Sequence, residues 1–222
     1  MKMSKNINIK GIIFDLDGTL INSMDVWYKV DREFLIENGV KNPPREFSEK
    51  LKQLTIDKSS ELFISEFGLN LTKDYVIRRI EELVRIEYEE RIQLKSRVID
   101  LLDFLDEKGI RYCIATATYK SLATAVLRRY GIADRFAFIL TDEEYPKGKN
   151  YPDIFLGACE RFGSIPAETL VVEDAVHSIR TAKNSGFPVV AVYDKSAEPD
   201  CECIKSLADY YFNSVYEIKE LI

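Results

Sequence analysis

Two carboxylates directly follow an apolar stretch near the start of the chain. Residues 7–14 read Ile-Asn-Ile-Lys-Gly-Ile-Ile-Phe, and Asp15, Asp17 and Gly18 come immediately after them. Apolar runs of about four to eight residues that end at turn residues are typical of buried β-strands. In open α/β sheets, ligands bind just beyond the carboxyl ends of the strands. Because close carboxylates repel each other, the pair indicates a site for a hard divalent cation.

A hydroxyl and a lysine follow two later apolar runs. Thr116 ends the run 110–116 with Ala117 behind it, and a hydroxyl with free backbone N–H groups at a helix start can hold phosphate oxygens. Lys149 follows the run 136–141 and is able to neutralise both a carboxylate and a phosphate. Each has an alternative explanation, since Thr116 also suits a helix N-cap and lysines are mostly exposed.

A second acidic pair ends a fourth apolar run. Glu173 and Asp174 stand at the end of residues 169–173. If this run lies in the same parallel sheet as residues 7–14, both acidic pairs reach one edge of that sheet. Oxygen ligands from the two pairs together would form a cage suited to Mg²⁺.

The elements that must hold these groups alternate along the chain. Short apolar runs are separated by helix-like segments; in one of these, Leu122, Val126 and Tyr130 share a helical face and Gly131 follows as a stop. This alternation predicts an α/β fold with a Rossmann-like parallel sheet and helices on both faces. The predicted strands span residues 7–14, 110–116, 136–141, 169–173 and 188–193.

Between residues 22 and 96 the pattern is helical throughout. Trp27, Val30 and Phe34 recur at helical spacing, and so do apolar residues from Ile77 to Ile92. An all-helical cap domain, residues 22–96, is therefore expected inside a core domain that comprises residues 1–21 and 97–222.

The composition limits the possible partners. The net charge is −6 without a Lys/Arg block, which argues against nucleic acid as a partner. The sequence has neither a signal-peptide pattern nor an 18-residue apolar run, so a cytoplasmic protein without membrane contact is expected. The single histidine, His177, excludes a site built from several histidines and is expected at the surface or behind the site. The spacing of the four cysteines does not suit a disulfide framework.

The order of these groups resembles the haloacid dehalogenase superfamily, in the branch of phosphoglycolate phosphatase and β-phosphoglucomutase. The resemblance covers nearly the whole chain, including the helical insert after the first acidic motif. The matching segments are Asp15-Leu16-Asp17-Gly18-Thr19, Thr116, Lys149 with Pro152-Asp153, and Glu173-Asp174. Together they are specific for the superfamily and say little about the substrate.

The resemblance implies a role for each matching residue. Asp15 is expected to be the nucleophile that becomes an aspartyl-phosphate, and Asp17 the general acid and then the general base. Thr116 and Lys149 are expected to bind the transferring phosphoryl group. The expected magnesium ligands are Asp15, Asp17 through its backbone carbonyl, Asp174 and Glu173. The residues expected to contact substrate are Gly18, Thr19, Ala117, Ser23 and Trp27.

The resemblance favours a phosphatase over a mutase. The mutase branch has a cap histidine and a cap arginine whose positions fall here on Trp27 and Ile56. A monomeric hydrolase of a small phosphate monoester is therefore expected, such as a sugar phosphate, phosphoglycolate or a nucleotide-like ester. A phosphomutase is the main alternative, and a catalytically silent phosphate-binding or signalling protein a remote one. Asn150 replaces the usual proline after the motif lysine, so Lys147 is an alternative to Lys149.

Overall fold

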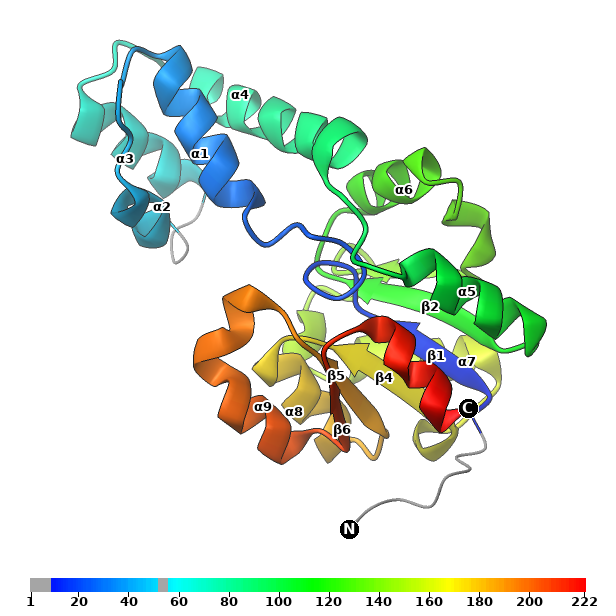
Figure 1. Cartoon of the computed structure of the whole chain (residues 1–222). Helices are drawn as coiled ribbons and strands as arrows, with labels where there is room; N and C mark the ends of the chain where they lie inside the picture. Colours follow the sequence, from blue (N-terminus) through cyan, green and yellow to red (C-terminus); the bar gives the residue numbers. More distant parts are fainter. Residues whose placement is uncertain (1–8, 52–55) are drawn as a thin grey trace. The chain divides into compact units, whose positions relative to one another are not determined.

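The computed structural model describes residues 9–51 and 56–222, which form two compact units (Figure 1). One unit comprises Met1–Ser23 and Ile92–Ile222, and the other comprises Met24–Arg91. These limits differ by a few residues from the division expected from the sequence. That the two units are domains with separate roles stays a prediction.

The first unit is built on a six-stranded parallel sheet with the order β3-β2-β1-β4-β5-β6. The predicted Rossmann-like α/β fold is thus confirmed. The strands are β1 (Gly11–Phe14), β2 (Arg111–Thr116), β3 (Ile139–Thr141), β4 (Thr169–Glu173), β5 (Val189–Val192) and β6 (Tyr210–Phe212).

The strand register brings the polar strand ends to one edge. Phe14, the last residue of β1, pairs with Ile114 of β2 on one side and with Val172 of β4 on the other. The strand order reverses between β1 and β4, and such a reversal is where open α/β sheets bind ligands. Residues directly after β1, β2 and β4 therefore share this position.

Helices cover both faces of the sheet. Ile13, Cys113 and Val171 point to one face, where they form a buried core with residues of α7, α8 and α9. Figure 1 shows α5 and the C-terminal turn Val215–Leu221 in front of the sheet, on the opposite side. The helices of this unit are α5 (Val98–Glu107), α6 (Lys120–Arg129), α7 (Asp153–Phe162), α8 (Val176–Asn184) and α9 (Cys201–Leu207).

The strand limits differ most from the sequence prediction at β1, β3 and β6. The described part of β1 begins at Gly11, where a Cβ atom would come within 2.7 Å of the Phe162 ring, so this close approach requires glycine. The backbone of residues 136–138 forms isolated hydrogen bonds to β2, such as Ala137 N–H to Tyr112 O (2.9 Å), and β3 starts at Ile139. The short edge strand β6 was not predicted.

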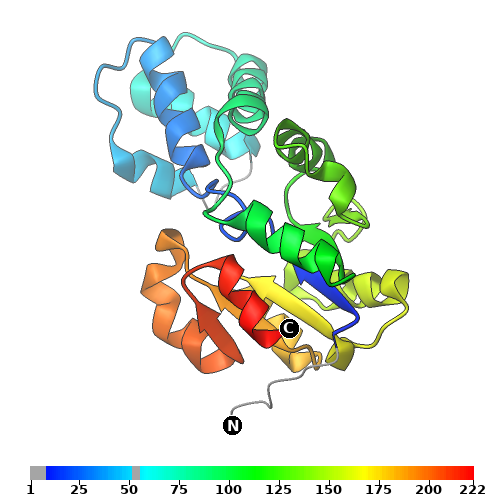
Figure 2. The ribbon, with the colours of Figure 1, turned by 45° about the vertical axis from the view of Figure 1, so that its right-hand side comes forward.

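The second unit is helical in its described residues, as Figure 2 shows. Phe34, Phe47 and Phe63 pack edge to face in its core, with ring centroids 4.9–5.1 Å apart. Trp27 does not share the buried face of Val30 and Phe34, because its indole is 56% exposed. The elements are α1 (Val26–Glu37), α2 (Arg45–Leu51), α3 (Ile56–Phe67), α4 (Lys73–Ile86) and the π-helical turn η1 (Glu87–Arg91). None of the helices in the described ranges has the length and apolar character needed to cross a membrane.

Candidate active site

Three buried carboxylates meet at the carboxyl edge of the sheet. One oxygen each from Asp15, Glu173 and Asp174 lies within 4.8 Å of the others. Lys149 extends between two of them, with Nζ donating to Asp15 Oδ1 and to Glu173 Oε1, the latter at 2.5 Å. The second Asp15 oxygen, Oδ2, is buried and has no hydrogen-bond partner among the described residues. One lysine thus faces three acids, and one acid oxygen remains open.

Burial and mutual repulsion disfavour the charged form of these acids. Burial raises the pKa of Asp15 above its ordinary value; Lys149 opposes this rise, and Glu173 and Asp17 add to it. Burial also raises the pKa of Asp174, with further repulsion from Asp15 and Glu173. A cation placed among them would restore the charged forms.

Lys149 occupies the position expected of the motif lysine. It lies on the short turn η3 (Gly148–Asn150) and is only 8% exposed. Burial alone would lower its pKa, but Asp15 and Glu173 outweigh that effect and raise the pKa well above its ordinary value. The alternative, Lys147, has a 64% exposed side chain 3.8 Å from Asp153. The structure therefore brings Lys149, not Lys147, to the acids.

Three hydroxyls hold the Asp17 carboxylate. Ser23 Oγ donates to Oδ1 at 2.6 Å, and Thr118 Oγ1 and Thr116 Oγ1 donate to Oδ2 at 2.7 and 3.2 Å. The Asp17 side chain is not part of the three-carboxylate cluster. Ser23 was predicted to contact substrate, but its hydroxyl here is engaged by Asp17.

Gly18 shapes the turn that separates Asp17 from the strand. Its φ of +85° is accessible to glycine at little cost, and its N–H donates to Ile21 O at 3.0 Å. A Cβ atom at this position would overlap Asp174 Oδ2 and come within 2.8 Å of Asp174 Cγ. Gly18 thus lets the turn pack directly against Asp174.

Glu173 connects the strand end to the next helix. Its Oε2 accepts hydrogen bonds from the backbone N–H groups of Asp174 and Ala175, at 3.0 and 3.1 Å. Its other oxygen, Oε1, is held by Lys149. Because both oxygens are engaged, Glu173 fixes the backbone that carries Asp174.

The other predicted residues have different surroundings. The Thr19 hydroxyl is fully buried, with no partner in the described chain. Ala117 is exposed beside Thr118. Trp27 belongs to the second unit. His177 is exposed on α8, with Nε2 3.2 Å from Ser178 Oγ.

Sequence reasoning missed two residues. Thr118 was not among the predicted site residues, yet its hydroxyl makes the shorter of the two threonine hydrogen bonds to Asp17. Asp142 directly follows β3 at the same sheet edge; its Oδ1 is buried without a partner among described residues, and burial raises its pKa. An acid directly behind the predicted strand 136–141 was the available signal for Asp142.

The donor set fits a hard divalent cation. Asp15, Glu173 and Asp174 offer carboxylate oxygens, which such ions prefer, and Lys149 supplies the single positive charge among them. The unpartnered Asp15 Oδ2 is the most direct structural sign, since a buried anionic oxygen without a partner is costly. Asp15 and Asp174 are the acids with oxygens left to bind an ion.

Comparison with known proteins gives a consistent result. A family model described as haloacid dehalogenase-like hydrolase matches residues 12–192. The chain is 30% identical over 230 residues to the mitochondrial (DL)-glycerol-3-phosphatase 1 of Arabidopsis thaliana, covering 96% of this chain and 72% of that protein. It is 24% identical to hexitol phosphatase B of Escherichia coli, over 97% of both chains. A HAD family hydrolase of Deinococcus radiodurans, solved with bound phosphate and sodium, superposes with a TM-score of 0.75 at 19% identity, over 96% of this chain and 94% of that one.

Proposed function

Since the chain belongs to the haloacid dehalogenase-like hydrolase family, we propose that it is a Mg²⁺-dependent phosphatase that acts on a small phosphate monoester. Family membership and the hydrolase class were both expected from the sequence and are confirmed by the family match over residues 12–192. The metal, the covalent intermediate and the substrate belong to the proposal.

The observation that carries the proposal is the environment of Asp15. Its Oδ1 accepts a hydrogen bond from buried Lys149, and its Oδ2 is buried and open. A carboxylate is a weak nucleophile toward a phosphate dianion because both are negative. Lys149 offsets part of this repulsion where the two charges meet, which favours phosphoryl transfer to Asp15.

In the first step, an Asp15 oxygen attacks phosphorus and the ester P–O bond breaks. Asp17 is the general acid that gives its proton to the leaving oxygen, which departs as an alcohol. Hydrogen bonds from Ser23, Thr116 and Thr118 orient the Asp17 carboxylate for this transfer. Lys149 and the Thr116 hydroxyl face the transferring phosphoryl group.

In the second step, Asp17 removes a proton from water as the water oxygen attacks phosphorus. The P–O bond to Asp15 breaks, inorganic phosphate leaves and Asp15 returns to its carboxylate form. One carboxylate thus forms the covalent bond and its neighbour moves the protons, which divides a difficult reaction into two easier ones.

Asp15, Asp174 and the backbone carbonyl of Asp17 would hold the magnesium ion, with Glu173 assisting directly or through water. When bound, Mg²⁺ supplies charge neutralisation between the nucleophile and the phosphate. Glu173 is engaged by Lys149 and by two backbone N–H groups, so its principal role is to position Asp174.

The substrate proposed is a small phosphorylated compound such as a sugar phosphate, phosphoglycolate or a nucleotide-like ester. Relatives named for glycerol 3-phosphate and hexitol phosphate support a small polyol or sugar ester. Gly18, Thr19, Ala117, Ser23 and Trp27 stay the proposed substrate contacts. We also propose a cytoplasmic monomer.

A phosphate-release screen with Mg²⁺ tests the proposal, over sugar phosphates, polyol phosphates, phosphoglycolate, nucleoside monophosphates and an aryl phosphate. Release is expected for at least one class, with loss in Asp15→Asn and Lys149→Met and retention in the matched control Lys147→Met. Conversion of β-glucose 1-phosphate to glucose 6-phosphate without phosphate release would instead identify a mutase. Undiminished release by Asp15→Asn would refute the nucleophile.

A further inference from the structure

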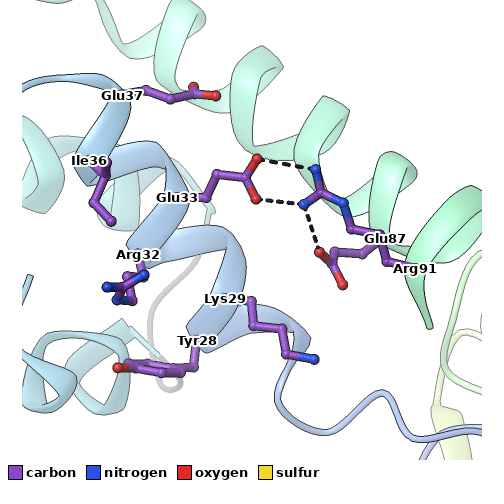
Figure 3. Close-up of a pocket in the computed structure, with 8 residues that line it drawn as sticks. All are labelled: Tyr28, Lys29, Arg32, Glu33, Ile36, Glu37, Glu87 and Arg91. Carbon is purple, nitrogen blue, oxygen red and sulfur yellow. Dashed lines mark hydrogen bonds and ion pairs between the residues drawn. The ribbon is translucent and has the colours of Figure 1, made fainter. Parts of the chain in front are cut away.

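A cavity lies within the helical unit. It measures about 680 Å³ and is lined by one face of α1 from Tyr28 to Glu37, together with Glu87 and Arg91 of η1 (Figure 3). All of these residues belong to the unit Met24–Arg91, so this unit contains the cavity by itself. Its volume is within the range of roughly 300–1,000 Å³ that is usual for small-molecule sites.

The carboxylates that line this cavity are already engaged. Arg91 donates to Glu33 at 2.7 Å and to Glu87 at 3.0 Å. Glu37 accepts two hydrogen bonds from Arg79, at 2.5 and 2.9 Å. Arginines of the same unit therefore already pair with the carboxylates of all three glutamates. These carboxylates do not require a positively charged ligand.

The cations at the other end of the cavity are not engaged. Figure 3 shows Tyr28, Lys29 and Arg32 at one end of α1, apart from the Glu33–Arg91–Glu87 network. Within residues 9–51 and 56–222, neither Lys29 nor Arg32 has a carboxylate partner. The guanidinium of Arg45 adds a further positive charge, 5.0 Å from the centroid of the Tyr28 ring. A complementary ligand must therefore bring acceptor oxygens.

The backbone at η1 is an independent sign of function. Residues Glu87–Arg91 form a π-helical turn at the end of α4, and π-turns are rare and occur frequently at functional sites. Glu87 on this turn is buried and paired with Arg91, while Arg91 reaches across to Glu33 on α1. The turn thus contributes Glu87 and Arg91 to one wall of the cavity, across from α1.

We propose that this cavity is a non-catalytic binding site for a small organic oxyanion. Its phosphate, phosphonate or carboxylate group is held by Lys29 and Arg32, and its apolar part lies against Tyr28 and Ile36. Charge-assisted hydrogen bonds to two such donors give the site its selectivity for anions. The site is built from residues of the helical unit alone and does not depend on the proposed phosphatase reaction.

The test uses phenylphosphonate, which has no ester bond to hydrolyse, and inorganic phosphate, both titrated into the full chain in EDTA. Trp27 is the only tryptophan and adjoins Tyr28, so its fluorescence reports on the cavity, and calorimetry measures the same binding without a probe. Saturable binding is expected, tighter for phenylphosphonate. Lys29→Gln/Arg32→Gln is expected to weaken it at least about tenfold. The control Lys41→Gln, an exposed lysine of the same unit, is expected to leave it unchanged.

Further variants decide whether the binding belongs to this cavity. Lys149→Met removes any phenylphosphonate binding at the acid cluster, and the binding that depends on Lys29 and Arg32 is expected to remain in this variant. Tyr28→Ala is expected to abolish the preference for phenylphosphonate over phosphate. Circular dichroism checks that each variant is folded, and single Lys29→Gln replaces the double variant if that one is not. Absence of binding by calorimetry, full binding by the Lys29 and Arg32 variants, or complete loss of binding in Lys149→Met would each overturn the proposal.

Discussion

Asp17, the proposed general acid and base, is held in one orientation by hydroxyl groups. Three hydroxyls, from Ser23, Thr116 and Thr118, donate to its two oxygens. An acid-base group must keep one orientation through two proton transfers, and hydrogen bonds on both oxygens restrict its rotation. Thr118 has the shorter contact with Oδ2 and is expected to matter more than its place in the sequence suggests.

Thr118→Val removes the 2.7 Å hydrogen bond to Asp17 while keeping the side-chain shape. Hydrogen bonds to charged groups contribute about 1.5–3 kcal/mol, so kcat is expected to fall about tenfold or more, with little change in KM. Thr118→Ser restores the hydroxyl and is expected to recover most of the rate. Steady-state kinetics across pH measure the effect, and an unchanged kcat in Thr118→Val would remove Thr118 from the site.

Alanine substitutions at Gly18 and Gly163 distinguish the effect of backbone strain from the effect of a steric clash. Both have positive φ, +85° at Gly18 and +68° at Gly163. A Cβ atom added at Gly18 would clash with Asp174, whereas a Cβ atom added at Gly163 would have no neighbouring atom within 4 Å. Gly163→Ala is expected to lose about 1–2 kcal/mol of stability with activity intact. Gly18→Ala adds displacement of Asp174 and is expected to lose activity and metal binding as well. Urea unfolding and kinetics compare the two; equal activities would contradict the assigned contact.

At the scale of elements, parallel pairing explains why sequence reasoning located most of the sheet edge. Asp15, Thr116 and Glu173 each end an apolar run, and parallel strands place such ends together. Lys149 was singled out because it follows the run 136–141, but its turn η3 has no periodic pattern, so Lys147 stayed an alternative. The hydroxyl contacts of Thr118 depend on how α6 begins after β2, a geometry that residue spacing does not specify. The strand β6 was missed because three residues at a sheet edge carry too little pattern.

Helix α1 contains a buried carboxylate, Asp31, whose effect on the free energy of unfolding depends on pH. Asp31 is 4% exposed, and burial raises its pKa from 3.8 to about 6, partly offset by a hydrogen bond with Ser48. Because the folded pKa exceeds the unfolded one, the folded state binds more protons between about pH 4 and pH 6. The free energy of unfolding therefore falls as pH rises through this window and stays low above it.

Asp31→Asn removes this charge and is expected to stabilise the helical unit. The gain at pH 8 is expected to exceed the gain at pH 5 by about 1 kcal/mol, and its upper limit is about 3 kcal/mol. The matched control Asp74→Asn, an exposed position on α4, is expected to show no such pH dependence. Urea unfolding followed by circular dichroism measures both. If Asp31→Asn raised the free energy of unfolding equally at pH 5 and pH 8, burial of the charged Asp31 would not destabilise the folded chain.

At the scale of the whole molecule, the proposed ion at the sheet edge would affect the stability of the entire core unit. Asp15, Glu173 and Asp174 lie at or directly after the carboxyl ends of β1 and β4. These two strands are separated by more than 150 residues of sequence and are hydrogen-bonded neighbours in the sheet. A metal ion bound only by the folded chain stabilises it by mass action, by about 2.7 kcal/mol at one hundred times Kd. The same binding removes the repulsion that raises the pKa of Asp15 and Asp174.

Magnesium is therefore expected to raise the melting temperature, and EDTA to reverse the rise. For a chain of 222 residues, each kcal/mol corresponds to about 2–4 °C, so saturating Mg²⁺ is expected to add about 5–10 °C. Asp174→Asn is expected to abolish the rise, because it removes an acid whose oxygens are left to bind the ion. Asp142→Asn removes an acid that follows β3 outside the cluster and is expected to keep the rise. Scanning calorimetry of the three proteins measures this, and an undiminished rise in Asp174→Asn would locate the ion elsewhere.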